Sequence, residues 1–290
     1  MTVDRTSQFE LCRERMRRLA YRLLGTVEDA DDIVQEAYLK WVSVSASEVR
    51  SAEAWLTTVV TRLCIDRLRA RRREESSHVG PWLPEPLYVE DTISTEAITG
   101  DLSLALLVLL ERLTPEERAT YLLHDIFDYK YRDISSVMGK TEPACRQLLH
   151  RARKRVREGR PRYQVSDSAR NELVLKFVQA LENNDQALLI SVLEEDATIT
   201  TDGGGRVKAA LNVVHGSERI ARLLLSVRKK KVGSIVERVM RINGEPGVVT
   251  YVGGIPNSLV AFQIDQERVG AIYRILDPIK LMGVPKLPRD

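Results

Sequence analysis

The segment HVGPWLPE, residues 78–85, separates two long stretches of helical periodicity. Its prolines remove backbone donors and fix φ, so neither neighbouring helix can continue through it. A flexible linker would be rich in Gly and Ser and would have no reason to carry an indole. We therefore assign residues 76–100 as a linker and expect Trp82 to contact another part of the chain. The alternative is an ordinary tryptophan tucked under a loop.

Length and composition restrict the class of protein. A chain of 290 residues favours two or so domains, and 43% hydrophobic with 29% charged residues is typical of a globular protein. No apolar run approaches the roughly 20 residues that span a bilayer, and the N-terminus lacks the apolar core of a signal peptide. We predict a cytoplasmic protein without a membrane partner. Cys12, Cys64 and Cys145 form no CxxC pair and are expected to be reduced; a redox sensor is the alternative.

The positive charge is concentrated in two clusters. Residues 62–73 hold six arginines against one acid, and residues 146–162 hold eight basic residues against one acid. Such clusters favour phosphate binding. Solvated helix faces are the alternative for either cluster alone, but two clusters, each at the end of a predicted helix, indicate a nucleic-acid partner.

The N-terminal part, residues 1–75, is predicted to be a helical domain. Apolar residues recur at helical spacing over 9–24 and 28–42, and Gly25 ends the first of these helices. Residues 43–50 are Ser-rich and indicate a loop. A third helix begins near Ser51 and ends in the first arginine cluster.

The second helical domain, residues 101–162, ends in a helix-turn-helix pattern. Gly139 permits a tight turn, Thr141 can cap the following helix, and Pro143 is tolerated in its first turn. The outward positions of that helix carry donors that suit base edges and phosphates in a major groove. These residues are Arg146, Gln147, His150, Arg151, Arg153 and Lys154. A packed helical hairpin without a ligand is the alternative.

Residues 166–290 are predicted to form an α+β domain. Helices are expected at 169–181, 185–193 and 217–227, the last capped by Ser217. Alternating β-type runs indicate antiparallel strands: ATITTD, AALNVV, SIVERVMRI, GVVTYVG, LVAFQI and VGAIYRIL. Asp196, Asp202 and His215 are candidate acid–base groups, but Asp202 followed by three glycines reads better as a turn. With no Walker loop, zinc-spaced Cys/His set or nucleophile elbow, we expect no cofactor, no metal and no catalysis.

Two stretches together resemble a known family. RRLAYRLLGTVEDADDIVQEAYLKW followed by AWLTTVVTRLCIDRLRARRR resembles region two of extracytoplasmic-function (ECF) sigma factors, and the helix-turn-helix stretch resembles their region four. The resemblance implies two all-α domains whose partners are core RNA polymerase, through its β′ coiled coil and β flap, and promoter DNA. The β′ coiled coil would be bound by Asp29, Asp32, Gln35 and Glu36. The melted promoter strand would be bound by Arg62, Arg67, Arg69, Arg71, Arg72 and Arg73.

The linker and C-terminal residues are similar to the ECF sigma factors that carry a fused SnoaL-like domain, a cone-shaped fold of the NTF2 type. Members have WLPEP and DGGG sequences and a terminal NPDKL; here the last is DPIKL, which differs at two positions. The resemblance implies that the linker docks on this domain. The linker residues are Trp82, Leu83, Pro84, Glu85 and Pro86. Their expected partners are Asp202, Gly203, Gly204, Gly205, Asp277, Pro278, Lys280 and Leu281.

The function implied is that of an ECF sigma factor, modulated in cis by its C-terminal domain, where a small-molecule ligand is conceivable. Two alternatives stay open at this point. One is a one-component, ligand-sensing regulator that binds duplex DNA without polymerase. The other is a DNA-tethered SnoaL-like enzyme.

Overall fold

A computed structural model describes residues 5–45, 49, 51–74, 80–89, 102–159 and 165–287. The chain divides into two compact units. The first comprises residues 1–76 and 106–160, and the second comprises residues 77–105 and 161–290. His78 and Val79 of the HVGPWLPE segment lie outside the described residues, as do residues 46–48 and 50 of the predicted Ser-rich loop.

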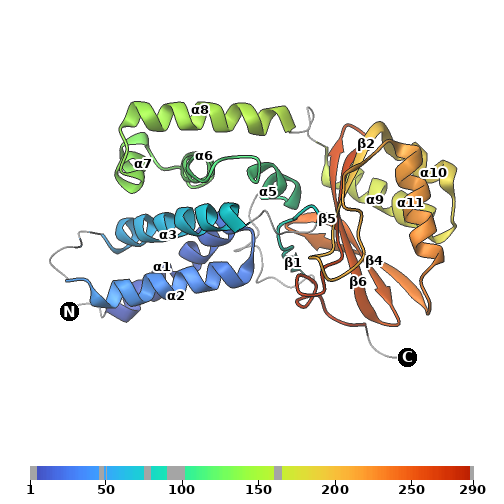
Figure 1. The fold of residues 1–290 in the computed structure, drawn as a ribbon, viewed down its shortest axis with the longest axis horizontal. Coiled ribbons are helices and arrows are strands. Elements are labelled where there is room, and N and C mark those ends of the chain that lie inside the picture. The colour runs from blue at the N-terminus through green and yellow to red at the C-terminus, as the bar shows by residue number, and fades with distance from the viewer. Residues whose placement is uncertain are drawn as a thin grey trace. The chain divides into compact units, whose positions relative to one another are not determined.

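The first unit is helical (Figure 1). Its N-terminal part contains α1 (Arg5–Leu24), α2 (Val27–Ser43) and α3 (Ala52–Glu74). Gly25 ends α1 at a positive φ of 77°, as its sequence position predicts. The three helices pack through buried side chains such as Leu23, Ala37 and Leu56.

The C-terminal part of this unit begins within α5 (Leu104–Leu110), because the division between the units falls after residue 105. It continues with α6 (Pro115–Tyr121), the π-helical turn η3 (Leu122–Ile126), α7 (Tyr131–Met138) and α8 (Glu142–Gly159). Gly139 adopts the left-handed conformation at φ 61° and joins α7 to α8. The Thr141 hydroxyl accepts a long bond of 3.4 Å from the Ala144 amide. The predicted helix-turn-helix is therefore present.

The second unit is a mixed sheet with helices on one face (Figure 1). Its helices are α9 (Asp167–Glu182), α10 (Gln186–Ser191) and α11 (Ser217–Lys229). Its strands are β1 (Tyr88–Val89), β2 (Leu193–Asp202), β3 (Val214–His215), β4 (Ile235–Ile242), β5 (Glu245–Val252), β6 (Ile255–Asp265) and β7 (Arg268–Ile275). The strand order is β1-β4-β5-β6-β7-β2-β3. Phe177, Leu189, Ile220 and Ile272 belong to the core between helices and sheet.

Three details of the prediction were wrong. The strands are not all antiparallel, because β2 pairs with β7 in parallel. AALNVV is not a strand except at Val214: a turn at 203–207 precedes it, and Leu211 is exposed. Ser217 does not cap α11; Gly216 is the N-cap at φ 93°, its amide bonded to the Ala197 carbonyl at 2.8 Å.

Candidate nucleic-acid interface and linker contact

The outward face of α8 carries all six of the predicted DNA-binding residues in exposed positions. Cys145, Leu148, Leu149, Ala152 and Val156 are buried on the opposite face. This division follows the helical period, so the exposed side chains form one continuous surface on the second helix of the motif.

Three of the six side chains bind other residues of the same unit. Arg153 donates to both carboxylate oxygens of Asp125 at 2.6 and 2.9 Å. Arg151 donates to Glu117 at 3.0 Å, and Arg146 bonds Glu142 at 2.8 Å while lying over the Tyr131 ring. In contrast, Gln147, His150 and Lys154 make no hydrogen bond or ion pair with any other described residue. Among the six predicted residues, these three supply the side chains that are available without rearrangement.

Asp125 shows that the α8 ion pairs are well formed. Burial opposes ionisation of this carboxyl, but the bonds from Arg153 and His124 outweigh it and lower the pKa of Asp125 below its usual value. The π-helical turn η3 positions Asp125 beside α8.

Glu117 is a buried partner of the α8 arginines that the sequence analysis missed. Its side chain is only 2% exposed, yet it accepts bonds from Arg151 and Arg155 of α8. It also completes a capping box with Thr114 at the start of α6. The capping box could have been predicted, because Thr114-Pro-Glu-Glu117 matches the capping-box pattern. The pairing of Glu117 with the α8 arginines has no signal in the local sequence.

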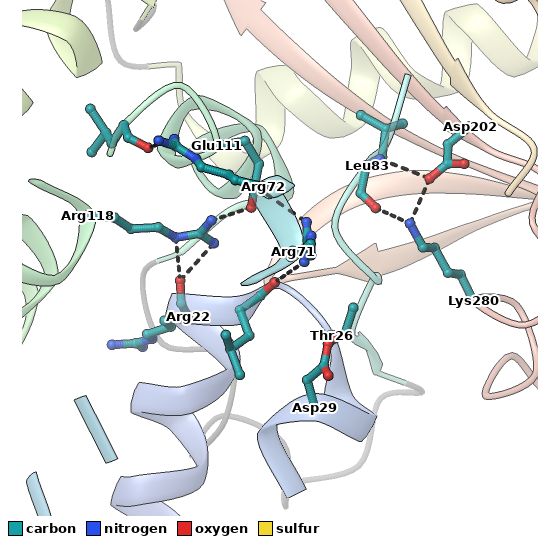
Figure 2. A network of polar contacts seen from close by, with 12 residues as sticks. Arg22, Thr26, Asp29, Arg71, Arg72, Leu83, Glu111, Arg118, Asp202 and Lys280 are labelled. Atoms are coloured by element: carbon teal, nitrogen blue, oxygen red, sulfur yellow. Dashed lines mark hydrogen bonds and ion pairs between the residues drawn. The ribbon is translucent and has the colours of Figure 1, made fainter. Parts of the chain in front are cut away.

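The α3 arginines are also bound within the first unit. Arg62 donates to the Val137 and Ser136 carbonyls at 3.0 and 3.3 Å, and Arg69 pairs with Glu116. Arg71 donates to the Leu24 carbonyl and Arg72 to the Leu113 carbonyl; both arginines are labelled in Figure 2. Arg67 binds Asp29 at 2.6 Å, and Arg73 bonds only the Arg69 carbonyl at 3.3 Å among the described residues. Most of these predicted phosphate contacts therefore hold α3 to neighbouring helices here.

The predicted polymerase-binding residues on α2 divide into two groups. Asp32, Gln35 and Glu36 are exposed. Asp29 instead binds Arg67 and Thr26. Burial opposes its charge, but these bonds prevail and lower its pKa.

An apolar component of the α2 face was also missed. Leu39, one turn beyond Gln35 and Glu36, is 65% exposed. It lines a groove of about 420 Å³ together with Phe9, Val34 and Tyr38. The face thus combines acidic and apolar groups, which suits a protein partner.

The linker segment 82–86, which we call the strap, contacts the C-terminal domain within the second unit. The Asp202 carboxylate is fully buried; its Oδ2 accepts the Leu83 amide at 2.9 Å and Lys280 Nζ at 2.7 Å. Lys280 also donates to the Leu83 carbonyl (Figure 2). Its Nζ lies 4.3 Å from the centre of the Trp82 ring. Leu83, Pro84 and Pro86 are buried, while Glu85 is half-buried.

The DGGG turn shapes this contact. Gly204 has φ 60°, and its amide donates to Asp202 Oδ1 at 2.8 Å. A Cβ on Gly204 would lie 2.2 Å from Asp277 Oδ2, so only glycine fits there. Asp277 bonds Arg206 at 3.2 Å and the Ile279 amide at 3.1 Å. The DGGG turn also includes Gly203 and Gly205. The turn that follows β7 includes Leu281 and the exposed Pro278.

Asn243 adds a second anchor that the sequence analysis did not include. It lies at φ 49° in the turn between β4 and β5. Its side chain accepts the Leu87 amide at 3.0 Å, and its own amide donates to the Leu87 carbonyl at 2.6 Å. Strand β1, next to Leu87, then pairs with β4.

The candidate acid–base groups do not converge. Asp196 and His215 are exposed, and Asp202 is paired with Lys280. Across the described ranges, no cluster of His, Cys, Asp and Glu could hold a metal ion. In the same part of the chain, no helix is long and apolar enough to cross a bilayer.

The three cysteines are free thiols. Burial is the largest influence on Cys64 and raises its pKa well above the usual value; it also raises the pKa of Cys12 and Cys145. A thiolate is the reactive form, so these environments disfavour the redox-sensing alternative.

Comparison with known proteins identifies the family. Residues 9–74 match the model of Sigma-70 region 2, and residues 103–156 match that of Sigma-70, region 4. The chain is 35% identical to the ECF RNA polymerase sigma factor SigJ of Mycobacterium tuberculosis, over 96% of this chain and 94% of that protein. The chain belongs to the ECF sigma factor family. Core RNA polymerase and promoter DNA are accordingly its partners.

A further relative of this sigma factor and a solved structure agree. It is 29% identical to the probable ECF sigma factor SigI of M. tuberculosis over 91% of this chain and 90% of that one. The crystal structure of M. tuberculosis SigJ has a TM-score of 0.78 at 33% identity and covers 97% of this chain and 99% of that chain. The predicted fold class, two helical sigma domains followed by an α+β domain, is confirmed.

Proposed function

We propose that this ECF sigma factor is controlled in cis by its C-terminal domain, through the strap. The observation that carries the proposal is the buried contact of Leu83 with Asp202 and Lys280. A tethered segment acts at an effective concentration in the millimolar range, so even an intrinsic affinity of roughly 100 μM leaves the contact mostly formed. A control device also needs contacts that differ between two states of the protein. We propose that strap docking differs between free and polymerase-bound protein.

The test is run-off transcription with purified core polymerase, comparing wild type with Lys280→Met. Removal of the Lys280 charge leaves Asp202 buried without its ion pair and weakens strap docking. We expect transcription to change while core polymerase still binds. Equal transcription by both proteins would refute control through the strap.

The domain assignment proposed is 1–75 for region 2, 76–100 for the linker, 101–162 for region 4 and 166–290 for the regulatory domain. The chain acts in the cytoplasm, where core polymerase is found, and catalyses no reaction of its own. The exposed α2 face binds the β′ coiled coil, region 4 binds the β flap and promoter, and α3 binds the melted strand. Because most α3 arginines hold other helices, DNA binding requires them to exchange partners.

Charge reversal on α2 tests the polymerase contact. We expect Asp32→Lys with Glu36→Lys to weaken binding to core polymerase by about tenfold or more, since both acids face a basic partner surface. Fluorescence anisotropy with labelled sigma factor measures this affinity. Glu172→Lys, an exposed change on α9, is the matched control. Unchanged affinity of the α2 variant would contradict this assignment and place the polymerase contact on another part of the chain.

The exposed α8 donors are expected to divide into base readers and phosphate contacts. Gln147→Ala should cost about 1–3 kcal/mol of discrimination at one promoter position. Lys154→Ala should instead weaken binding to all promoters alike and reduce its salt dependence. Polymerase-dependent binding to promoters altered base by base measures both. A uniform loss for Gln147→Ala would contradict its assignment as a reader.

A further inference from the structure

Four charged side chains lie together at the helix-covered face of the C-terminal sheet. Arg274 on β7 is 6% exposed, and the Glu237 side chain on β4 is 2% exposed. Arg228 lies in the last turn of α11, and Lys231 follows two residues after that helix. By strand alternation, Arg274 is on the same face as the core residue Ile272. These charges are therefore inside the layer that otherwise forms the hydrophobic core.

The cluster has more positive than negative charge. Arg228 pairs with Glu237, which leaves Arg274 and Lys231. Neither of these forms an ion pair with any described carboxylate, and the one hydrogen bond of the Arg274 side chain is to Ser258 at 3.5 Å. Burial lowers the pKa of Arg274 to about 10; burial, then repulsion from Arg274 and Arg228, lowers the pKa of Lys231 to about 8. Both remain charged at neutral pH.

The same cluster has an unused acceptor. Glu237 Oε2 is buried and has no hydrogen-bond partner among the described residues. Glu237 pairs in register with Thr250 on β5, and Thr250 pairs with Ser258 on β6. Both hydroxyl side chains are buried. The polar groups thus form a row across four strands, from Glu237 on β4 to Arg274 on β7.

Such an arrangement costs stability unless something completes it. An isolated buried cation and an unpaired buried carboxylate oxygen are each unfavourable. The protein retains both without pairing them with each other. A ligand with one negative group and one hydrogen-bond donor would satisfy both at once.

We propose that this cluster is a binding site for a small organic carboxylate that also carries a hydroxyl or amino group. The planar guanidinium of Arg274 binds the carboxylate through two parallel hydrogen bonds, and Lys231 supplies the second positive charge. Glu237 Oε2 accepts the hydrogen bond of the ligand's hydroxyl or amine. Val248 and Val260 of the same core contact its hydrocarbon part. The site binds and performs no chemistry.

The experiment is thermal unfolding of the full chain in a carboxylate-free buffer. The probes are acetate, lactate, alanine and 4-hydroxybenzoate, each with its primary amide as a control that lacks the carboxylate, and inorganic phosphate. We expect Tm to rise by about 3–6 °C at ten times Kd for the acids bearing a hydroxyl or amine. Acetate should act more weakly, and the amides should have no effect.

Two variants and a control locate the binding. Arg274→Met and Lys231→Met should abolish the rise, whereas Arg238→Met, an exposed arginine on β4, should retain it. Arg274→Met should also unfold at a higher temperature than wild type without ligand, because it removes an unpaired buried charge. Lys231→Met tests the site independently if Arg274→Met folds poorly.

Three results would overturn the proposal. The first is that no acid raises Tm at concentrations up to about 10 mM. The second is an equal rise in Tm for Arg274→Met and Arg238→Met. The third is a rise in Tm with phosphate alone. Polymerase is absent from the assay. Failure here therefore leaves control through the strap untouched, and failure of that control leaves ligand binding untouched.

Discussion

Asp202→Ala is expected to lower the free energy of unfolding of the C-terminal domain by about 3–5 kcal/mol and to release the strap. The substitution leaves Lys280 buried without its carboxylate and removes the acceptor of the Leu83 amide. It also removes the acceptor that holds the Gly204 turn. Chemical denaturation measures the stability, and limited proteolysis between residues 74 and 102 measures strap release.

Asp196→Ala is the matched control, since this aspartate lies on the same strand and is exposed. It should change stability by less than about 0.5 kcal/mol. The double variant Asp202→Asn with Lys280→Met should recover much of the loss, because it removes both charges and keeps an acceptor for Leu83. If Asp202→Ala were as stable and as protease-resistant as Asp196→Ala, the strap contact would not be energetically significant.

Glu117→Ala is expected to destabilise the first unit by about 3–5 kcal/mol. The buried carboxylate binds Arg151 and Arg155 and completes the capping box of α6, so its removal affects both α6 and α8. Denaturation followed by far-UV circular dichroism measures the effect. The sigma factor should also lose promoter-dependent transcription, because α8 is no longer held against α6.

Two further variants separate the causes. Glu117→Gln retains an acceptor for the cap but removes the charge, so it should show a smaller loss than alanine. Glu142→Ala removes an exposed partner of Arg146 and should cost no more than about 1 kcal/mol. A loss for Glu117→Ala as small as that for Glu142→Ala would mean that the buried ion pairs contribute little.

Local features of the fold were predictable from sequence because each depends on neighbouring residues. Gly25 and Gly139 end helices at positive φ, and the DGGG run forms the expected turn. The strands β4, β5, β6 and β7 appear where alternation predicted them. The α8 periodicity correctly separated the exposed face from the buried one.

Features that depend on distant residues were not predictable in this way. The sequence indicated that the α3 arginines were available for phosphate. Most of them instead bind carbonyls and carboxylates contributed by other helices and by the turn before α6. Asp29 was predicted to be a surface acid that binds the polymerase. In the structure it pairs with Arg67, 38 residues away in the sequence. The parallel pairing of β2 with β7 depends on the path of the whole domain.

The sequence by itself determined the family and most of the helices and strands, and it predicted which surface residues bind DNA and polymerase, since these depend on residue type and spacing. Only the tertiary structure decided which charges are already neutralised. It pairs Asp202 with Lys280 and Glu117 with two α8 arginines. In the part of the chain that the structure describes, it leaves Arg274 and Lys231 without a carboxylate partner. The reason is physical: the energy of an ion depends on burial and on partners that folding brings from distant positions in the chain.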